Sequence, residues 1–446
     1  MPSSNVPGST RAKSLALQEK AKKLIPGGSQ LLSKRSDMFA PGVWPGYYSK
    51  AKGAYVWDLD GNKYLDMSIS GIGANVLGYA DSDVDNAVIH AISNGSSSSL
   101  NCPEEVELAE LLCRLHPWAK KVRFTRSGGE AMAVAVRIAR AYTGRDKIAF
   151  CGYHGWQDWY LAANVGTKDA LGGYLIVGLE PNGVPKGLKN TIFPFKYNQI
   201  EELEKIVSAH KTDIGVIVME PVRNDIPENG FLAKVRDIAN NIDAVLIVDE
   251  ISAGFRMNTG GAHLVLGLEP DIAVFSKALG NGYPISAIIG KSDVMEAAQT
   301  TFISSTNWTE RIGPVAAIAT LIKHEKHDVG THLIRMWEII REGWKEFAAR
   351  SGIDINVGGI LPMGHFSFNY PNSLSMKSLF VQMMLERNFL ASTLYYAMFS
   401  HTDQNCRDYL EAAGEVFDKL VQLNREGKIE ETMAGKPAMV GFNRLT

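Results

Sequence analysis

The stretch PDIAVFSKALGNGYPISAIIG, residues 270–290, places one lysine between a short apolar run and a turn. The apolar run, residues 272–275, predicts a buried strand, and the glycines and proline that follow predict a turn. Lysine is among the residues least often buried without a partner. Lys277, at the end of this strand and beside glycines, is therefore either a surface residue of a loop or a group with a chemical role.

Short apolar runs and helical patterns alternate along the chain around this stretch. Runs of strand length occur at 122–126, 214–220 and 244–250, and helical periodicity occurs at 103–115 and 130–144. Continuous apolar strands between helices are typical of a mostly parallel sheet flanked by helices. The sequence therefore predicts an α/β fold for the central part of the chain.

The length of the chain, 446 residues, exceeds what a single hydrophobic core normally supports. We expect an N-terminal segment of helix and hairpin, residues 1–75, that belongs to a small domain. The alternating region is expected to form a large domain, residues 76–320. Residues 321–446 combine helical patterns with short strand-like pieces, and they are expected to form a smaller α+β domain.

Composition argues against several classes of protein. The formal net charge of −2 gives no electrostatic case for binding nucleic acid or an anionic membrane. The N-terminus lacks the apolar core of a signal peptide, and no apolar run approaches the ~18 residues of a membrane helix. The four cysteines are scattered without metal-ligand spacing, which is typical of reduced thiols. We therefore expect a cytoplasmic protein that binds neither nucleic acid, membrane nor metal.

Two further motifs follow strands in the alternating region. In TRSGGEA, residues 125–131, Gly128 and Gly129 stand between a strand and a helix. Backbone N–H groups at such a junction bind an anion or simply form a turn. In LIVDEISAGFR a buried strand ends in Asp249. An acid in that position needs a partner, so Asp249 either pairs with Arg256 or faces a nitrogen of a ligand.

Together, the strand-end lysine, the strand-end acid and the glycine-lined anion site match the requirements of pyridoxal 5′-phosphate (PLP). Lys277 would hold the aldehyde as a Schiff base, and Asp249 would pair with the ring nitrogen. The glycines and the helix N-terminus would bind the phosphate. The acid keeps the ring protonated, so that the ring withdraws electrons from the substrate carbon.

The order of these motifs resembles the class III (fold type I) PLP-dependent aminotransferases, and within that class the glutamate-1-semialdehyde aminomutase group. The resemblance runs from about residue 20 to the C-terminus. It rests on IPGG, KGAYVWDLDGNKYLDM, VRFTRSGGEAMAVAVRIARAYTGRDKI, GYHGW, VMEPV, VDEISAGFR and PDIAVFSKALGNGYPISAIIG. It implies a large PLP-binding domain with a mostly parallel sheet, a smaller α+β domain, and a homodimer with shared active sites.

The resemblance also implies roles for individual residues. Lys277 and Asp249 would be catalytic, and the cofactor-binding set would be Lys277, Asp249, Ser127, Gly128, Gly129, Tyr153, His154, Glu220 and Thr306. Tyr153 would stack on the cofactor ring, and Thr306 resembles the threonine that reaches the phosphate of the neighbouring subunit. As substrate residues, Lys34 and Arg35 lie where the group keeps a carboxylate-binding arginine, and Tyr396 lies where aminomutases carry a glutamate.

Departures from the group bear on the reaction. The usual SGTEA is SGGEA here, which removes a hydroxyl at Gly129, and SISGIGAN, residues 68–75, lacks the tryptophan of the aminomutases. With Tyr396, these changes favour an aminotransferase that works in two half-reactions between a small-molecule amino donor and a carbonyl acceptor. The hydroxyl and aromatic residues of these loops are compatible with a sugar-like or keto-acid acceptor.

Two alternatives remain open at this point. One is a glutamate-1-semialdehyde 2,1-aminomutase, and the other is a catalytically inactive PLP-binding regulatory or structural protein. A nicotinamide-dependent dehydrogenase is not supported, because no GxGxxG follows a strand.

Overall fold

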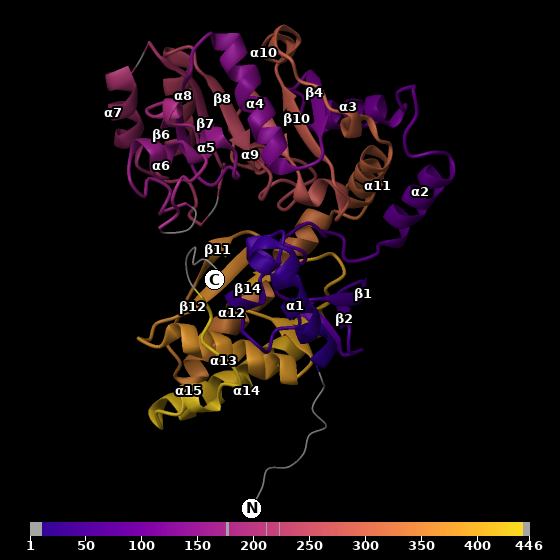
Figure 1. The fold of residues 1–446 in the computed structure, drawn as a ribbon, viewed down its shortest axis with the longest axis vertical. Helices are drawn as coiled ribbons and strands as arrows, with labels where there is room; N and C mark the ends of the chain where they lie inside the picture. Colours follow the sequence, from indigo (N-terminus) through magenta and orange to yellow (C-terminus); the bar gives the residue numbers. More distant parts are fainter. Residues whose placement is uncertain (1–10, 175–177, 211, 223, 440–446) are drawn as a thin grey trace, which may run out of the picture. The chain divides into compact units, whose positions relative to one another are not determined.

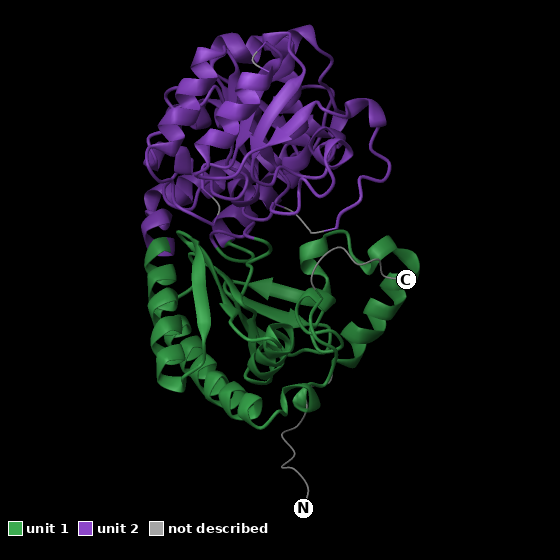
Figure 2. Cartoon of the chain, turned by 90° about the vertical axis from the view of Figure 1, so that its left-hand side faces the viewer, with its two compact units in different colours: residues 1–72, 78–81, 334–446 green, residues 73–77, 82–333 purple. Residues whose placement is uncertain are grey.

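The computed structural model describes residues 11–174, 178–210, 212–222 and 224–439 (Figure 1). The chain divides into two compact units (Figure 2). Unit 1 contains Met1–Ile72, Gly78–Asp81 and Ile334–Thr446, and unit 2 contains Gly73–Leu77 and Ser82–Leu333. Residues 1–10 of the expected N-terminal segment lie outside the described part of the chain.

The boundaries between the units differ from those expected at 75 and 320. The second boundary falls within helix α12 (Val329–Ser351), after Leu333. Sequence patterns show where a helix runs but not which unit each of its ends packs against, so a boundary inside a continuous helix leaves no signal in the sequence.

Unit 2 is built on a seven-stranded sheet with the order β4-β10-β9-β8-β7-β5-β6. All neighbouring pairs are parallel except the two that involve β10, which runs antiparallel to β9 and to β4. This confirms the expected mostly parallel α/β sheet. The strands are β4 (Lys121–Thr125), β5 (Lys147–Cys151), β6 (Ile192–Pro194), β7 (Ile214–Met219), β8 (Val245–Asp249), β9 (Ile272–Phe275) and β10 (Ser286–Gly290).

Helices cover both faces of this sheet, which explains why its strands are continuously apolar. Along β8, Val245 and Ile247 belong to the apolar cluster that includes helix α4 (Gly128–Thr143). The intervening residue Leu246 points to the opposite cluster, which includes helix α8 (Phe231–Asn241). Successive strand residues therefore enter different layers of the core.

The remaining helices of unit 2 surround these layers (Figure 1). They are α2 (Ser82–Ser93), α3 (Glu104–Leu115), α5 (Asp158–Leu161), α6 (Ala163–Gly166), α7 (Ile200–His210), α9 (Ala262–Val265), α10 (Ser292–Glu296) and α11 (Ile312–Lys326). Short 3₁₀ turns complete the unit at η4 (Lys186–Leu188), η5 (Lys277–Gly280), η6 (Ala297–Thr300) and η7 (Thr306–Thr309).

Unit 1 contains two smaller sheets with helices, as expected for an α+β unit. The first sheet has the order β1-β2-β3-β13 and the second has the order β11-β12-β14. The strands are β1 (Tyr48–Lys52), β2 (Tyr55–Asp58), β3 (Lys63–Met67), β11 (Ile355–Ile360), β12 (Met363–Phe368), β13 (Phe389–Ala391) and β14 (Leu394–Tyr396). The helices are α1 (Ala12–Leu24), α13 (Ser373–Glu386), α14 (Asp403–Arg425) and α15 (Ile429–Thr432), with 3₁₀ turns η1 (Pro26–Gly28), η2 (Leu32–Lys34) and η3 (Ser36–Met38).

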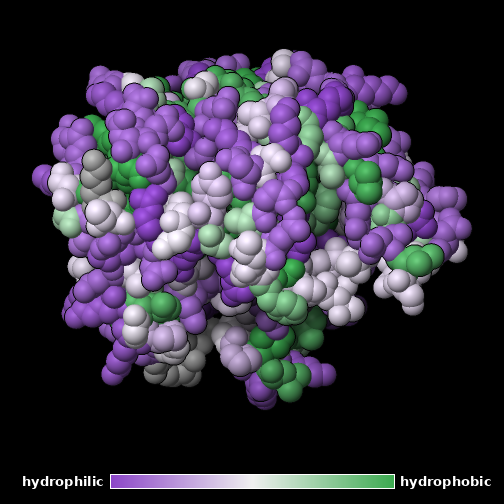
Figure 3. Space-filling model, turned by 90° about the horizontal axis from the view of Figure 1, so that it is seen from above, coloured by the Kyte–Doolittle hydropathy of each residue, from purple (hydrophilic) through white to green (hydrophobic). Residues whose placement is uncertain are grey.

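The surface is largely hydrophilic on the face shown in Figure 3, where apolar residues form small scattered groups. Within the described residues, no helix combines the length and the apolar character that crossing a bilayer requires.

Candidate active site

The candidate site lies where parallel strands of unit 2 end. Strands β4, β5, β8 and β9 point the same way, so the residues that follow them meet at one edge of the sheet. A pocket of about 180 Å³ lies there, and its lining is formed by Gly128, Gly129, Tyr153, His154, Gly155, Trp156, Asp249, Ile251, Ser252, Ser276 and Lys277. The three motifs singled out in the sequence therefore converge on one cavity.

Lys277 enters the pocket directly after β9 and begins the 3₁₀ turn η5. Its backbone φ of 41° lies in the left-handed region, which is uncommon for a residue with a side chain. Such strain of about 1–3 kcal/mol persists where the surrounding structure fixes it, often at functional sites. The Nζ atom donates a hydrogen bond to Oγ of Ser252 at 2.6 Å. Lys277 is therefore a lysine held inside a pocket, and the surface alternative does not apply.

Asp249 ends β8, is only 4% exposed and pairs with a histidine. Its Oδ2 lies 2.8 Å from Nδ1 of His154, and its Oδ1 accepts the amide N–H of Ile251 at 3.0 Å. His154 in turn has Nε2 3.1 Å from the carbonyl oxygen of Cys151. The alternative of an ion pair with Arg256 is wrong, since the described contacts of Asp249 are those with His154 and Ile251.

Glu250, the next residue along the chain, has a different environment. Its carboxylate accepts the amide N–H groups of Ala262 (3.0 Å) and His263 (2.7 Å) at the start of helix α9. A third contact joins its Oε1 to Nδ1 of His263 at 2.7 Å. Glu250 therefore stabilises the loop and the helix behind the site, whereas Asp249 lines the pocket.

The glycine motif forms the first turn of helix α4, which begins at Gly128. An ideal Cβ at Gly128 would lie 2.8 Å from Cδ1 of Ile251, and one at Gly129 would lie 2.1 Å from Nε2 of Gln157. The absence of both side chains leaves the amides at the helix N-terminus open for an anion. The Ser127 hydroxyl and amide both donate to Oε2 of Glu130, at 3.1 and 2.9 Å, and Ser127 and Glu130 form the capping box of helix α4.

Tyr153 is half-buried beside the pocket, and Glu220 fixes its backbone. Oε2 of Glu220 accepts the amide N–H of Tyr153 at 2.9 Å. The ring of Tyr153 packs edge-on against Tyr160, with 6.1 Å between the ring centroids. Glu220 lies outside the set of residues that line the pocket, so its contact with the site runs through the Tyr153 backbone.

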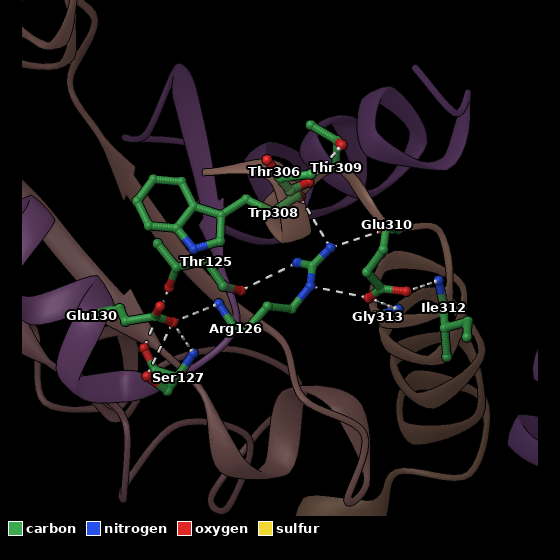
Figure 4. Close-up of polar contacts among 10 residues, drawn as sticks. All are labelled: Thr125, Arg126, Ser127, Glu130, Thr306, Trp308, Thr309, Glu310, Ile312 and Gly313. Carbon is green, nitrogen blue, oxygen red and sulfur yellow. Dashed lines mark hydrogen bonds and ion pairs between the residues drawn. The ribbon is translucent and has the colours of Figure 1, made fainter. Parts of the chain in front are cut away.

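Thr306 is exposed and begins the 3₁₀ turn η7. Figure 4 shows how this turn is tied to the glycine motif through Arg126. The guanidinium of Arg126 donates to the carbonyl oxygens of Trp308 (3.0 Å) and Glu310 (2.8 Å), and it forms an ion pair with the Glu310 carboxylate. The same carboxylate accepts the amides of Ile312 and Gly313 at the start of α11. The loop that carries Thr306 is therefore fixed to the residue just before Ser127.

The three expected substrate residues lie in unit 1. Arg35 forms an ion pair with Asp37, and Lys34 ends the 3₁₀ turn η2. The amide of Tyr396 donates to the Ser68 carbonyl at 2.7 Å, and the Ser70 hydroxyl donates to the Tyr396 carbonyl at 2.6 Å. The two segments that depart from the aminomutase pattern are thus joined by hydrogen bonds.

Four lining residues were not singled out from the sequence, namely Gly155, Ile251, Ser252 and Ser276. Each lies within three residues of a predicted site residue. Proximity to Tyr153, Asp249 or Lys277 is therefore the one signal that points to them.

The residues of this pocket fit PLP. The lysine, the carboxylate and the bare helix N-terminus are the three groups that the aldehyde, the ring nitrogen and the phosphate require, and all three line one cavity. Fold and site together define a fold type I PLP-dependent transferase. The family described as class III aminotransferases matches residues 39–361, and the chain belongs to this family. The protein is a PLP-dependent aminotransferase.

Individual relatives agree with this family. A 3-aminobutyryl-CoA aminotransferase from Cloacimonas acidaminovorans (strain Evry) is 32% identical over 424 residues, covering 91% of this chain and 96% of that protein. A glutamate-1-semialdehyde 2,1-aminomutase from Francisella philomiragia is 34% identical over 346 residues, covering 75% of this chain and 78% of that protein.

Solved structures show the same fold. A transaminase with PLP bound has a TM-score of 0.79 at 25% identity and covers 93% of this chain and 99% of that one. An omega-transaminase from Sphaerobacter thermophilus has a TM-score of 0.81 at 24% identity, with coverage of 93% and 99%.

Proposed function

We propose that the protein catalyses intermolecular amino transfer in two half-reactions, from a small-molecule amine to a carbonyl acceptor. The observation that carries this proposal is the single pocket in which Lys277, Asp249 and the α4 N-terminus meet. Lys277 is the catalytic base that moves a proton, and the 2.6 Å contact of its Nζ with Ser252 orients it. The match of residues 39–361 to the class III aminotransferases supports catalysis over an inactive PLP-binding protein.

The other residues bind and orient. The PLP ring, when bound, withdraws electrons from the substrate carbon. Asp249 would face the ring nitrogen, and His154 holds the Asp249 carboxylate in place through the 2.8 Å contact. The amides of Gly128 and Gly129 bind the phosphate. Tyr153 stacks on the ring, and Glu220 fixes the Tyr153 backbone.

We also propose that the active unit is a homodimer with shared sites. The resemblance to class III enzymes supports this, as does the exposure of Thr306 on a loop that Arg126 and Glu310 hold in place. In this proposal Thr306 donates to the phosphate in the neighbouring subunit, and Ser127 acts only as a helix cap.

Substrate-binding roles are proposed for three residues of unit 1. Lys34 and Arg35 bind an anionic group of the substrate, and Tyr396 contacts its other end. We propose a donor whose amino group is on the β-carbon. The name of the relative that spans 91% of this chain, a 3-aminobutyryl-CoA aminotransferase, supports that choice.

The second candidate is the 2,1-aminomutase, since a relative of that name is 34% identical over 346 residues. A mutase must retain its intermediate until both ends have reacted. The Ser68–Tyr396 and Ser70–Tyr396 hydrogen bonds place a tyrosine, not a carboxylate, beside the altered loop. The absence of the aminomutase glutamate at position 396 supports amino transfer between two molecules.

A donor and acceptor panel tests the proposal. The holoenzyme is given β-amino and α-amino donors, each with a keto-acid acceptor, and both products are quantified. The aminotransferase proposal predicts one new ketone per amine formed, and a β-amino donor is expected to be the fastest. In a parallel reaction the amino form of the enzyme receives glutamate-1-semialdehyde alone. Rapid conversion to 5-aminolevulinate would establish the mutase instead.

A further inference from the structure

The side-chain amide of Gln157 lies against the glycine motif of the pocket. Gln157 precedes helix α5 (Asp158–Leu161) and follows the GYHGW motif. Its Oε1 accepts the amide N–H of Trp156 at 3.2 Å, which defines the orientation of the carboxamide. The Nε2 atom then lies on the side of Gly129, so close that a Cβ on this glycine would be 2.1 Å away.

This Nε2 is buried and has no hydrogen-bond partner among the described residues. A buried donor without an acceptor costs free energy, so such a group in a native structure calls for an explanation. The position of the carboxamide suggests an acceptor on a ligand, because Gly129 and Gly155 both line the pocket and both lie against this carboxamide. A Cβ at Gly155 would lie 2.6 Å from Oε1 of Gln157.

The space beside Gly129 is therefore filled by a side chain from another loop. A serine or threonine at position 129 would place a hydroxyl in the region where Nε2 now lies. The adjoining amides of Gly128 and Gly129 begin helix α4 and favour an anion. The last torsion of a glutamine side chain is soft, so Nε2 is free to turn towards an acceptor bound at these amides.

We propose that Gln157 is a cofactor-binding residue whose Nε2–H donates a hydrogen bond to a phosphate oxygen of PLP. Its carboxamide supplies the side-chain donor that Gly129 lacks. This inference rests on the phosphate role proposed above for Gly128 and Gly129. It goes beyond that role by assigning a phosphate ligand to the GYHGW loop.

The experiment measures cofactor affinity and not activity. Apoenzyme is titrated with PLP and separately with pyridoxal, which lacks the phosphate, and binding is followed by absorbance and by quenching of protein fluorescence. Gln157→Ala is expected to weaken PLP binding by roughly tenfold, the scale of a lost hydrogen bond to a charged group, and to leave pyridoxal binding unchanged. Gln157→Glu keeps the shape but repels the phosphate, so a larger loss is expected.

A swap variant provides the matched control. In Gly129→Ser/Gln157→Ala the hydroxyl replaces the missing donor, and PLP affinity is expected to return towards the wild-type value. Gly129→Ser alone is expected to bind PLP poorly, because its side chain meets Nε2 of Gln157. Equal losses for PLP and pyridoxal in Gln157→Ala, or no loss for either, would overturn the assignment. If the wild-type apoenzyme itself binds both ligands equally, the phosphate role of the glycines fails, and this inference fails with it.

Discussion

The carboxylate of Asp249 lies 2.8 Å from Nδ1 of His154, and both side chains are almost completely buried. A buried carboxylate keeps its charge only when hydrogen bonds compensate for lost hydration. The His154 imidazole and the Ile251 amide contact the carboxylate of Asp249. Asp249 also lines the pocket, so the same carboxylate can contact a ligand there. This pair is the basis for the role of Asp249 towards the ring nitrogen.

Asp249→Asn is expected to lower kcat by two or more orders of magnitude, because a neutral amide does not hold the ring nitrogen protonated. Losing one preorganised electrostatic contact of this kind raises the activation barrier by about 2.7–4 kcal/mol. His154→Asn should lower kcat less, since it removes the side chain that orients Asp249 and keeps the Asp249 carboxylate itself. Steady-state kinetics of both variants test this order. Near-normal turnover of Asp249→Asn would show that the acid is structural.

Lys277→Ala is expected to abolish turnover, because Lys277 is the proposed base and the acid and imidazole of the lining, Asp249 and His154, are held to each other. The protein should still fold, with thermal unfolding close to that of the wild type. Lys291→Ala is the matched control: this lysine follows β10, which runs antiparallel, so it lies at the opposite edge of the sheet. Sustained turnover by Lys277→Ala without added amine would contradict the assignment.

Glu250→Ala is expected to lower the stability of the fold and to leave kcat nearly unchanged, although Asp249 is its neighbour in sequence. The substitution removes the acceptor for two amides of α9 and for His263, all of them buried. We expect a loss of about 3 kcal/mol or more in the free energy of unfolding, measured by denaturant titration. The kcat of the folded fraction should stay within a few-fold of the wild type. A hundredfold fall in kcat would place Glu250 in the site.

Stability is expected to fall as the pH drops from about 6.5 to about 4. Burial lowers the pKa of His116 and of His324 to about 4 in the folded protein, from 6.5 in an exposed histidine. The unfolded chain therefore binds more protons in this interval, and protonation favours unfolding. Each histidine contributes on the order of 3 kcal/mol above pH 6.5, and this contribution is lost as the pH falls through the folded pKa.

Unfolding midpoints recorded from pH 4 to 8 test the role of these histidines. His324→Gln should flatten the lower part of the curve, because one of the two titrations is removed. The exposed His90→Gln is the control and should leave the curve unchanged. A wild-type curve that is flat between pH 4 and 6.5 would contradict the prediction.

The sequence by itself determined the sheet and the three anchoring groups of the site. Lys277, Asp249 and the Gly128-Gly129 pair each follow an apolar run, and parallel strands bring such positions to one edge. Periodicity and strand ends are local properties, so they can be read without knowing how distant segments pack. The boundary between the units within α12 and the hydrogen-bond partners of each side chain depend on how distant segments pack, so the sequence pattern did not reveal them.

Only the tertiary structure decided which neighbour each group meets. Asp249 pairs with His154, 95 positions earlier, and not with the nearby Arg256. Lys277 meets Ser252, and Gln157 fills the space beside Gly129. These contacts join loops whose paths depend on packing against other elements, and the hydrophobic pattern of a loop carries little information about its path. The strands therefore fixed the position of the site, whereas the loops, folded against one another, decided its detailed chemistry.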